Sequence, residues 1–247
     1  MKAWEDLPAD LRTASVRPYY DALARKKADL AFRRLFDVAA SGLMLVLLSP
    51  VFLVLAIAIK LDSPGPVFFR QTRVTRYGKQ FRIFKFRTMV SDAEKRGSLV
   101  TTKSDARITR VGRVIRRFRL DELPQLIDIL RGTMTYVGTR PEVPKYVERY
   151  TPEMKATLLL PAGVTSLASI YYKDEDQLLA GTANADRTYI ERILPAKMHW
   201  NLKGMLEFSF WSDIGLMFMT FFAMLGKDYR ADTLNSIAHG EAATGNE

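Results

Sequence analysis

The segment from Val38 to Ile59 contains no charged residue, so any fold of this chain has to bury it or place it in a membrane. About twenty apolar residues are enough for one membrane-spanning helix. Ser49 and Pro50 lie near its middle, where proline removes a backbone hydrogen bond and clashes with the preceding turn. The sequence therefore predicts a bend, with two arms of roughly 15 Å each, about half the thickness of the hydrocarbon layer.

Basic residues flank this segment on both sides. Arg33 and Arg34 precede it, and the following basic residues are Lys60, Arg70, Arg73 and Arg76. Because positive charge favours the cytoplasmic side, both ends are expected there. The prediction is a re-entrant helix, break and helix that enters and leaves one leaflet, with Ser49 available to the backbone groups that Pro50 frees. A proline-kinked span and a buried helix of a soluble core are the alternatives.

The overall charge indicates an anionic partner. The chain has 37 Lys and Arg against 27 Asp and Glu, a formal charge of +10. Nucleic acid, a phospholipid surface and a phosphorylated small molecule all fit that charge. The absence of cysteine excludes disulfides, thiolate catalysis and Cys-ligated metals. Since His199 and His239 are the only histidines, carboxylates remain as the candidate reactive groups.

Patterns along the rest of the chain predict short elements. Residues 1–30 are too polar for a signal peptide and are expected to form a loose arm that ends in a helix from about Pro18. Residues 67–74 and 81–87 predict a β-hairpin, because apolar and basic residues alternate in the second stretch; a nucleic-acid-binding sheet is the weaker alternative. We expect a surface helix and mobile loop between Ser91 and Ser104, and an amphipathic helix over 105–118.

Further elements are predicted in the second half of the chain. Residues 123–130 form a short helix that Gly132 ends, and another helix covers about 152–160. The stretch 163–172 is read as extended, and 174–177 as the polar start of a helix. The last apolar run, within 197–225, is too short to span a bilayer, which leaves a core helix or an interfacial one.

Asp121 and Glu122 form an adjacent acid pair in a basic setting. Arginines of the helix before them (Arg113, Arg116, Arg117 and Arg119) and Arg140 in the loop after them surround the pair. Carboxylates bind hard cations and arginine binds phosphate with two parallel hydrogen bonds, so the pattern is suited to a metal ion and a phosphorylated ligand together. The alternatives are a helix-capping role for Asp121 and a solvated arginine face.

Several motifs in this order resemble a known family. They are R-R-L-F-D (33–37), L-L-S-P (47–50), G-P-V-F-F-R-Q (65–71), F-K-F-R-T-M (84–89), R-L-D-E-L-P-Q-L (119–126) and V-G-T-R-P (137–141). Over roughly residues 30–225 the chain is similar to the bacterial monotopic phosphoglycosyl transferases, in their small single-domain form. One departure is Thr139, where many members have proline.

The resemblance implies an enzyme that transfers a sugar 1-phosphate from a UDP-sugar to polyprenyl phosphate and releases UMP. Asp121 would be the nucleophile that carries the phosphosugar, and Asp121 and Glu122 would hold Mg²⁺. Lys85, Arg116 and Arg140, with Arg87 as a further candidate, match the basic positions for the phosphates. The implied place is the cytoplasmic face of the bacterial inner membrane, in the first membrane step of exopolysaccharide, O-antigen or glycoprotein biosynthesis.

The predicted architecture is α+β and mostly helical. It comprises an arm with a helix (1–30), the re-entrant helix (31–61), a small cytoplasmic catalytic domain with a short β-hairpin and interfacial helices (62–229), and a flexible tail (230–247). The expected partners are the two substrates and membrane lipids, without nucleic acid, and a homodimer is left open. The competing hypothesis is a non-enzymatic, membrane-attached protein that binds anionic lipid or nucleic acid. That protein would gain nothing from acids within its basic site.

Overall fold

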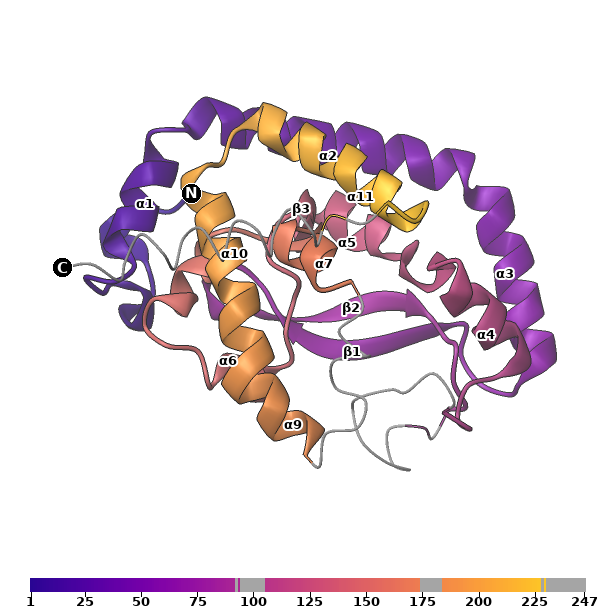
Figure 1. Ribbon diagram of the computed structural model, residues 1–247. Coiled ribbons are helices and arrows are strands. Elements are labelled where there is room, and N and C mark those ends of the chain that lie inside the picture. Colours follow the sequence, from indigo (N-terminus) through magenta and orange to yellow (C-terminus); the bar gives the residue numbers. More distant parts are fainter. Residues whose placement is uncertain (92, 94–104, 174–183, 228, 230–247) are drawn as a thin grey trace.

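A computed structural model describes residues 1–91, 93, 105–173, 184–227 and 229 (Figure 1). The described chain is mostly helical and contains two small sheets of two strands each, which confirms the predicted α+β class. The elements expected within 91–104 and 174–177 lie largely or wholly outside the described residues. The flexible tail predicted after residue 229 does so too.

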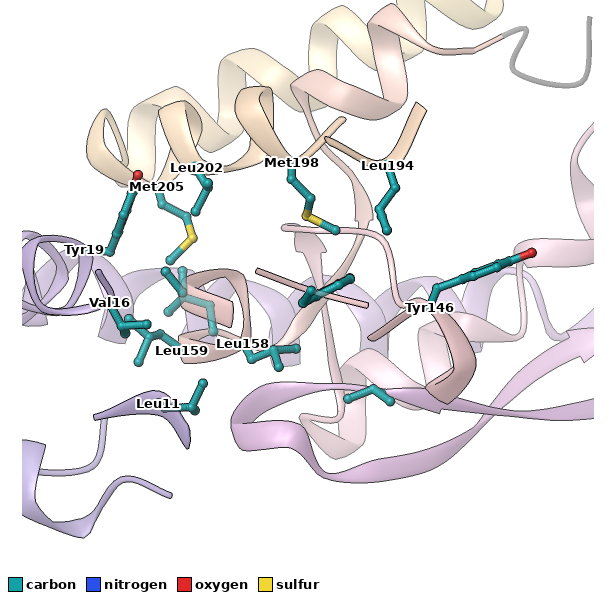
Figure 2. Close-up of a cluster of buried hydrophobic side chains, with 14 of the residues drawn as sticks. Leu11, Val16, Tyr19, Tyr146, Leu158, Leu159, Leu194, Met198, Leu202 and Met205 are labelled. Carbon is teal, nitrogen blue, oxygen red and sulfur yellow. The ribbon is translucent and has the colours of Figure 1, made fainter. Parts of the chain in front are cut away.

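The N-terminal residues are part of the main hydrophobic core. Two 3-10 turns, Trp4–Asp6 and Ala9–Leu11, precede helix α1, Arg17–Ala24, so the helix start predicted near Pro18 is confirmed. The expected loose arm is wrong, because Leu11 and Val16 are only 1% and 0% exposed. Figure 2 shows Leu11 and Val16 facing Leu159 in the centre of that core. Burial of these side chains outweighs the polarity of the residues between them.

The apolar segment forms two helices that meet at a sharp bend. Helix α2, Lys27–Leu47, and helix α3, Ser49–Asp62, are inclined by 61° at Leu48. In an uninterrupted helix the N–H of residue 50 would bind the carbonyl of Val46; proline has no N–H, and the Ser49 hydroxyl donates to that carbonyl at 2.8 Å instead. The predicted break is confirmed, and it falls at Leu48, directly before Ser49 and Pro50.

The surface of this helix pair is largely apolar. In the described chain no single helix has the length and apolarity to cross a membrane, whereas the bent pair together does, judged by length and composition alone. Val46 is 71% exposed and Leu61 is 83% exposed. The alternative of a helix buried in a soluble core is therefore wrong.

The hairpin is present as predicted. Strand β1, Phe68–Val74, pairs antiparallel with β2, Gln80–Phe86, around a 3-10 turn at Arg76–Gly78. Phe86 is buried against Phe68 and against Phe52 of α3. The hairpin is thereby fixed to the helix pair, and Phe86 serves as core.

The amphipathic helix begins later than its periodicity suggests. Helix α4 covers Arg110–Arg117 because the side chain of Thr109 accepts a hydrogen bond from the Gly112 N–H at 3.0 Å and caps it. A 3-10 turn at Leu120–Glu122 leads to α5, Gln125–Arg131, which ends at Gly132 with φ of 80° as predicted. The α5 carbonyls of Ile129 and Leu130 accept hydrogen bonds from Arg34 of α2 at 2.7 and 2.8 Å.

The sequence pattern missed a parallel strand pair. Strand β3, Met134–Val137, lies beside β4, Ala162–Thr165, and between them come α6, Pro144–Val147, and a 3-10 helix at Met154–Leu159 where a helix was expected. The stretch read as extended stops early, because Ser166 caps α7, Leu167–Tyr171. Four-residue strands are too short to carry a periodic signal.

Gly138 and Gly163 let the backbones of β3 and β4 approach closely. A Cβ at Gly163 would lie 2.1 Å from the Gly138 nitrogen. Gly163→Ala should therefore separate the strands and lower stability by about 1–3 kcal/mol, measured by chemical or thermal unfolding. Gly215→Ala is the matched control, because a Cβ there meets nothing within 4 Å, and it should leave stability equal or slightly higher. Equal stability of the two variants would contradict the close approach.

The C-terminal helices pack against the core and against α2. They are α9, Ala185–Thr188, a π-helix at Tyr189–Ile193, α10, Leu194–Leu206, and α11, Phe210–Met224. Figure 2 shows Met198, Leu202 and Met205 of α10 pointing into the main core. Trp211 is 76% exposed and Phe218 62%, so α11 is not a core helix; an interfacial position stays a prediction.

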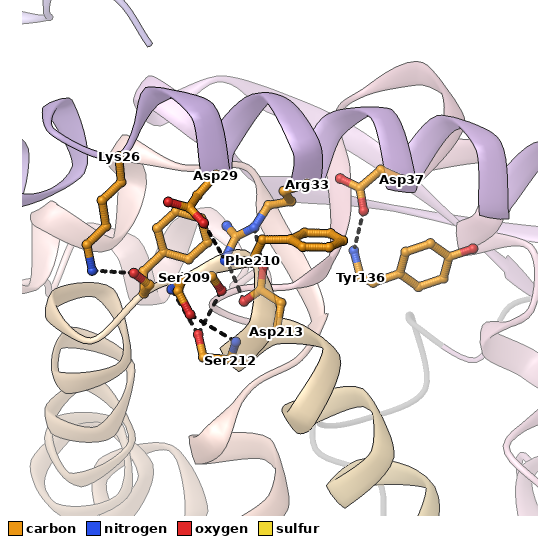
Figure 3. Close-up of polar contacts among 10 residues, drawn as sticks. Lys26, Asp29, Arg33, Asp37, Tyr136, Ser209, Phe210, Ser212 and Asp213 are labelled. Carbon is orange, nitrogen blue, oxygen red and sulfur yellow. Dashed lines mark hydrogen bonds and ion pairs between the residues drawn. The ribbon is translucent and has the colours of Figure 1, made fainter.

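An ion pair and a hydrogen bond join α2 to α11. The guanidinium of Arg33 donates to both carboxylate oxygens of Asp213, at 2.5 and 2.8 Å, and Asp29 accepts a hydrogen bond from the Phe210 N–H (Figure 3). Asp37 accepts from the Tyr136 N–H of β3. Arg33 and Arg34, expected as basic residues beside the apolar segment, thus make intramolecular contacts, and Arg33 is buried.

Candidate active site

Two predicted basic residues, Lys85 and Arg140, contact the carboxylate of a third predicted site residue, Glu122. Lys85 Nζ donates to Glu122 Oε1 at 3.0 Å, and Arg140 binds both Glu122 oxygens, with Nη1 to Oε2 at 3.3 Å and Nη2 to Oε1. Arg140 Nη1 also reaches the carbonyl of Val164 at 3.4 Å. The structure therefore brings together the hairpin, the acid pair and the V-G-T-R-P loop, which lie far apart in the sequence.

Each element presents its residue for a local reason. Lys85 lies two residues after Ile83 on β2 and shares its face, while buried Phe86 points to the opposite face, because successive side chains of a strand alternate. Arg119 adopts φ of 54°, in the left-handed region, and this turns the chain sharply from α4 into the 3-10 turn that carries the acids. Gly138 begins the loop of Arg140, and its N–H donates to the Thr165 carbonyl at 2.8 Å.

Asp121 lies next to this cluster without an ion pair to any described residue. It is inside the 3-10 turn and caps no helix, since neither the turn nor α5 has a side-chain cap. The capping explanation is therefore wrong. Burial and the adjacent charge of Glu122 raise the pKa of Asp121, while Lys85 and Arg116 oppose the shift.

Glu122 has the opposite electrostatic setting. Burial alone would raise its pKa, but Arg140 and Lys85 outweigh that effect and hold the pKa of Glu122 well below its usual range. The same ion pair raises the pKa of Arg140. Two neighbouring carboxylates thus differ sharply: one is fixed as an anion between two cations, and the other is half-buried and available.

The other predicted basic residues lie in different places. The charge of Arg116 acts to lower the pKa of Asp121, although its side chain forms no hydrogen bond or ion pair with any described residue. Arg87 is 4% exposed and donates to carbonyls at the end of α3, including Ser63 at 2.7 Å and Pro64. The structure does not bring Arg87 to Glu122, and a phosphate role for it stays a prediction.

Sequence reasoning missed Arg73 behind the site. Its Nη1 donates to the Pro141 carbonyl at 3.0 Å and so supports the loop of Arg140. Burial lowers the pKa of Arg73, and the charge of Glu142 opposes that shift. A weak signal was available, because Arg73 directly precedes the apolar Val74 in the predicted hairpin, but it looked like one more surface arginine.

The described residues contain no cluster of three or more His, Cys, Asp or Glu side chains that could hold a metal ion. Mg²⁺ in phosphate-transfer sites is commonly bound by one or two carboxylates together with substrate phosphates. Asp121 fits that pattern, because no described cation pairs with it. Both oxygens of Glu122 are already engaged by Lys85 and Arg140.

The chain is similar in sequence to known proteins. Residues 28–227 match the family model described as bacterial sugar transferase. A protein named UDP-N-acetylgalactosamine-undecaprenyl-phosphate N-acetylgalactosaminephosphotransferase, from Aeromonas hydrophila, is 35% identical over 76% of this chain and 42% of its own length. A UDP-glucose:undecaprenyl-phosphate glucose-1-phosphate transferase from Escherichia coli is 33% identical over 86% of this chain and 44% of its own.

A relative from Caulobacter vibrioides with that same glucose-1-phosphate transferase name is 40% identical over 67% of this chain and 64% of its own length. The chain thus spans less than half the length of the first two relatives and about two thirds of the third. The family match includes Lys85, Asp121, Glu122 and Arg140 and covers most of the described fold. The chain belongs to the bacterial sugar transferase family.

Proposed function

We propose that this protein transfers a sugar 1-phosphate from a UDP-sugar to polyprenyl phosphate through a covalent intermediate on Asp121. A carboxylate oxygen of Asp121 attacks the β-phosphorus, the bond to the bridging oxygen breaks, and UMP leaves. An oxygen of polyprenyl phosphate then attacks the same phosphorus and expels the carboxylate, giving polyprenyl diphosphate sugar. The two steps let one site serve a soluble donor and a lipid acceptor in turn.

The contrast between the two adjacent carboxylates carries this proposal. When the surroundings of two neighbouring acids push their pKa values apart, the two acids commonly have different chemical roles. Glu122, held between Lys85 and Arg140, organises the cations that would face the diphosphate. Asp121 has no ion pair in the described chain, so one of its oxygens can attack the phosphorus while the other holds a metal ion.

The basic residues and a metal ion would neutralise the negative charge of the phosphates. Arg140 and Lys85 place positive charge beside Asp121, and both residues act on it electrostatically together with Arg116. Asp121, next to the ion-paired Glu122, would hold Mg²⁺ together with the substrate phosphates, and the ion would supply further neutralisation of the diphosphate. The residues themselves orient the donor, and Lys85 and Arg116 oppose the rise in the pKa of Asp121 that burial and Glu122 cause.

The bent helix pair supports a place at the membrane. Its exposed apolar side chains and its 61° break suit a re-entrant element that enters one leaflet from the cytoplasmic face of the inner membrane. In that position the active site lies near the level of lipid phosphates. The product would then enter glycan assembly on the carrier lipid.

The decisive experiment is a UMP-release assay with a panel of UDP-sugars and a short polyprenyl phosphate. We expect UMP release with at least one UDP-sugar, and a phosphosugar adduct on the protein when the acceptor is omitted. The panel also identifies the preferred sugar. Membrane binding without UMP release from any donor would instead favour the non-enzymatic lipid-binding hypothesis.

Topology provides a separate prediction. Because the chain has no cysteine, single cysteines at the exposed positions Lys27 and Lys79 can be labelled selectively from either side of the membrane. Both should react from the cytoplasmic side. Pro50→Leu restores the missing N–H and should shift the cysteine at position 79 toward the opposite side. Labelling on opposite sides in the protein with Pro50 intact would replace the re-entrant arrangement with a span.

A further inference from the structure

A buried polar group lies directly behind the loop of Arg140. Glu142, two residues further along, is 7% exposed, and its Oε1 accepts a hydrogen bond from the hydroxyl of Tyr189. Lys197 Nζ lies 3.7 Å from the same oxygen and donates to the Tyr189 hydroxyl at 3.2 Å. Glu142, Tyr189 and Lys197 together are called the rear triad below.

The rear triad comes from two parts of the chain. Glu142 belongs to the loop after β3, whereas Tyr189 is the first residue of the π-helix and Lys197 lies on α10. A π-helix is rare and frequently marks a functional site. Here it places Tyr189 beneath the loop, where its ring packs on Tyr146 at 4.7 Å between centroids.

Further contacts fasten the same two segments together. The Tyr146 hydroxyl donates to Asp186 Oδ1 at 2.7 Å, and Lys145 pairs with Asp186 Oδ2. Unlike these contacts, which have exposed partners, the rear triad is buried on all three residues. Buried charged groups are costly unless paired, so Glu142 is held firmly to this one set of partners.

The backbone and the charges connect the rear triad to Arg140. The Glu142 carbonyl accepts from the Val74 N–H at 3.0 Å, and Pro141 accepts from Arg73, so the loop between Arg140 and Glu142 is fixed on both sides. Glu122 raises the pKa of Arg140 most, and Glu142 adds to that effect. Arg140 thus lies between a carboxylate at the reacting centre and a carboxylate anchored in the core.

We propose that Glu142, Tyr189 and Lys197 are positioning residues, which hold the Arg140 guanidinium against the active site through the loop. The inference rests on the proposed function, since it assigns these residues to the phosphate-binding arginine of that reaction. Pro141 lies between Arg140 and Glu142 and restricts the backbone there, and Pro144 restricts the chain just after Glu142. A displacement of Glu142 is therefore transmitted to Arg140 and not absorbed by the loop.

Tyr189→Phe tests this directly, because it removes the hydroxyl and keeps the ring that packs on Tyr146. We expect kcat for UMP release to fall about tenfold, with KM for the UDP-sugar within about twofold. In an Arg140→Lys background the same substitution should change kcat by less than about twofold, because its effect passes through Arg140. Glu142→Gln is a second variant with the same expectation.

Tyr19→Phe is the matched control. Tyr19 is also a buried tyrosine that donates to a carboxylate, Glu153, at 2.7 Å, but it lies at the far side of the same core. It should leave kcat unchanged in both backgrounds. A tenfold loss from Tyr189→Phe in both backgrounds would mean that Tyr189 acts independently of Arg140, and an unchanged kcat would mean that it does not act at all; either result overturns the proposal.

A measurement without turnover separates this inference from the proposed function. In ¹⁵N-arginine-labelled protein, the Nε–H signal of Arg140, assigned by its loss in Arg140→Lys, should exchange with water at least about fivefold faster in Tyr189→Phe than in wild type or Tyr19→Phe. Unchanged exchange would count against the positioning role even if wild type releases UMP. Absence of UMP release from wild type would count against the proposed function alone.

Discussion

Asp121→Asn should abolish UMP release while leaving the protein at least as stable as wild type. The substitution removes the proposed nucleophile and keeps its shape, so turnover should fall by at least about 10⁴-fold. Stability should not fall, because the fold makes ionisation of Asp121 unfavourable, as its raised pKa indicates. Removing a charge that the folded state disfavours relieves a cost that is present at neutral pH.

The pH dependence follows from the same shift. A raised folded pKa means that the folded state binds the Asp121 proton more tightly than the unfolded chain does, so the stability cost vanishes as the pH falls below the unfolded value. Activity behaves in the opposite way, since only the carboxylate attacks phosphorus. We expect kcat/KM to decline with falling pH at a value above the ordinary aspartate range.

These outcomes are measured by UMP release from pH 5 to 8 and by thermal unfolding of both proteins. Asp21→Asn, which breaks the exposed Arg17–Asp21 pair on α1, is the control for loss of a carboxylate and should change neither result. UMP release by Asp121→Asn at the wild-type rate would rule out Asp121 as the nucleophile.

Glu122→Gln should have the opposite effect on stability. It leaves Lys85 and Arg140 side by side without their shared counter-charge. Breaking a buried ion pair from one side is strongly destabilising, and the partial exposure of Arg140 reduces that loss to about 2–4 kcal/mol. The apparent Tm should fall by roughly 5–10 °C. Activity should fall by about 10²-fold or more, because the two cations separate.

The lowered pKa of Glu122 also gives a pH signature. A depressed folded pKa contributes stability above the unfolded value, and that stability is lost as the pH falls through the folded pKa. The Tm difference between wild type and Glu122→Gln should therefore shrink in acid. A Glu122→Gln protein as stable as wild type at neutral pH would contradict the central ion pair.

Much of the architecture could be predicted from the sequence because its signals are local. The break at Leu48, directly before Ser49 and Pro50, follows from the missing proline N–H, and the hairpin follows from the alternation around Ile83. The acid pair could be recognised because it lies between an arginine-rich segment and the loop of Arg140. Local patterns also account for the turn at Gly132, where only a left-handed backbone ends the helix.

What could not be predicted depends on contacts between distant residues. Nothing around Leu11 indicates that it pairs with Leu159, and the parallel strands β3 and β4 are too short for a pattern. The different settings of Asp121 and Glu122 arise only when Lys85 and Arg140 arrive from other elements. Arg33 looked like a flanking charge because its partner Asp213 is 180 residues away.

The contacts of α2 determine which residues can be deleted to obtain a water-soluble form of this protein. Deleting residues 27–62 to obtain a water-soluble fragment would remove Arg33 and leave Asp213 buried without a counter-charge. It would also take away the Arg34 guanidinium that closes α5, the helix that directly follows the two acids. The hydrophobic helices cannot be cut away as a detachable anchor. Surface redesign of their outward side chains, with Arg33 and Arg34 retained, is the route to a soluble variant.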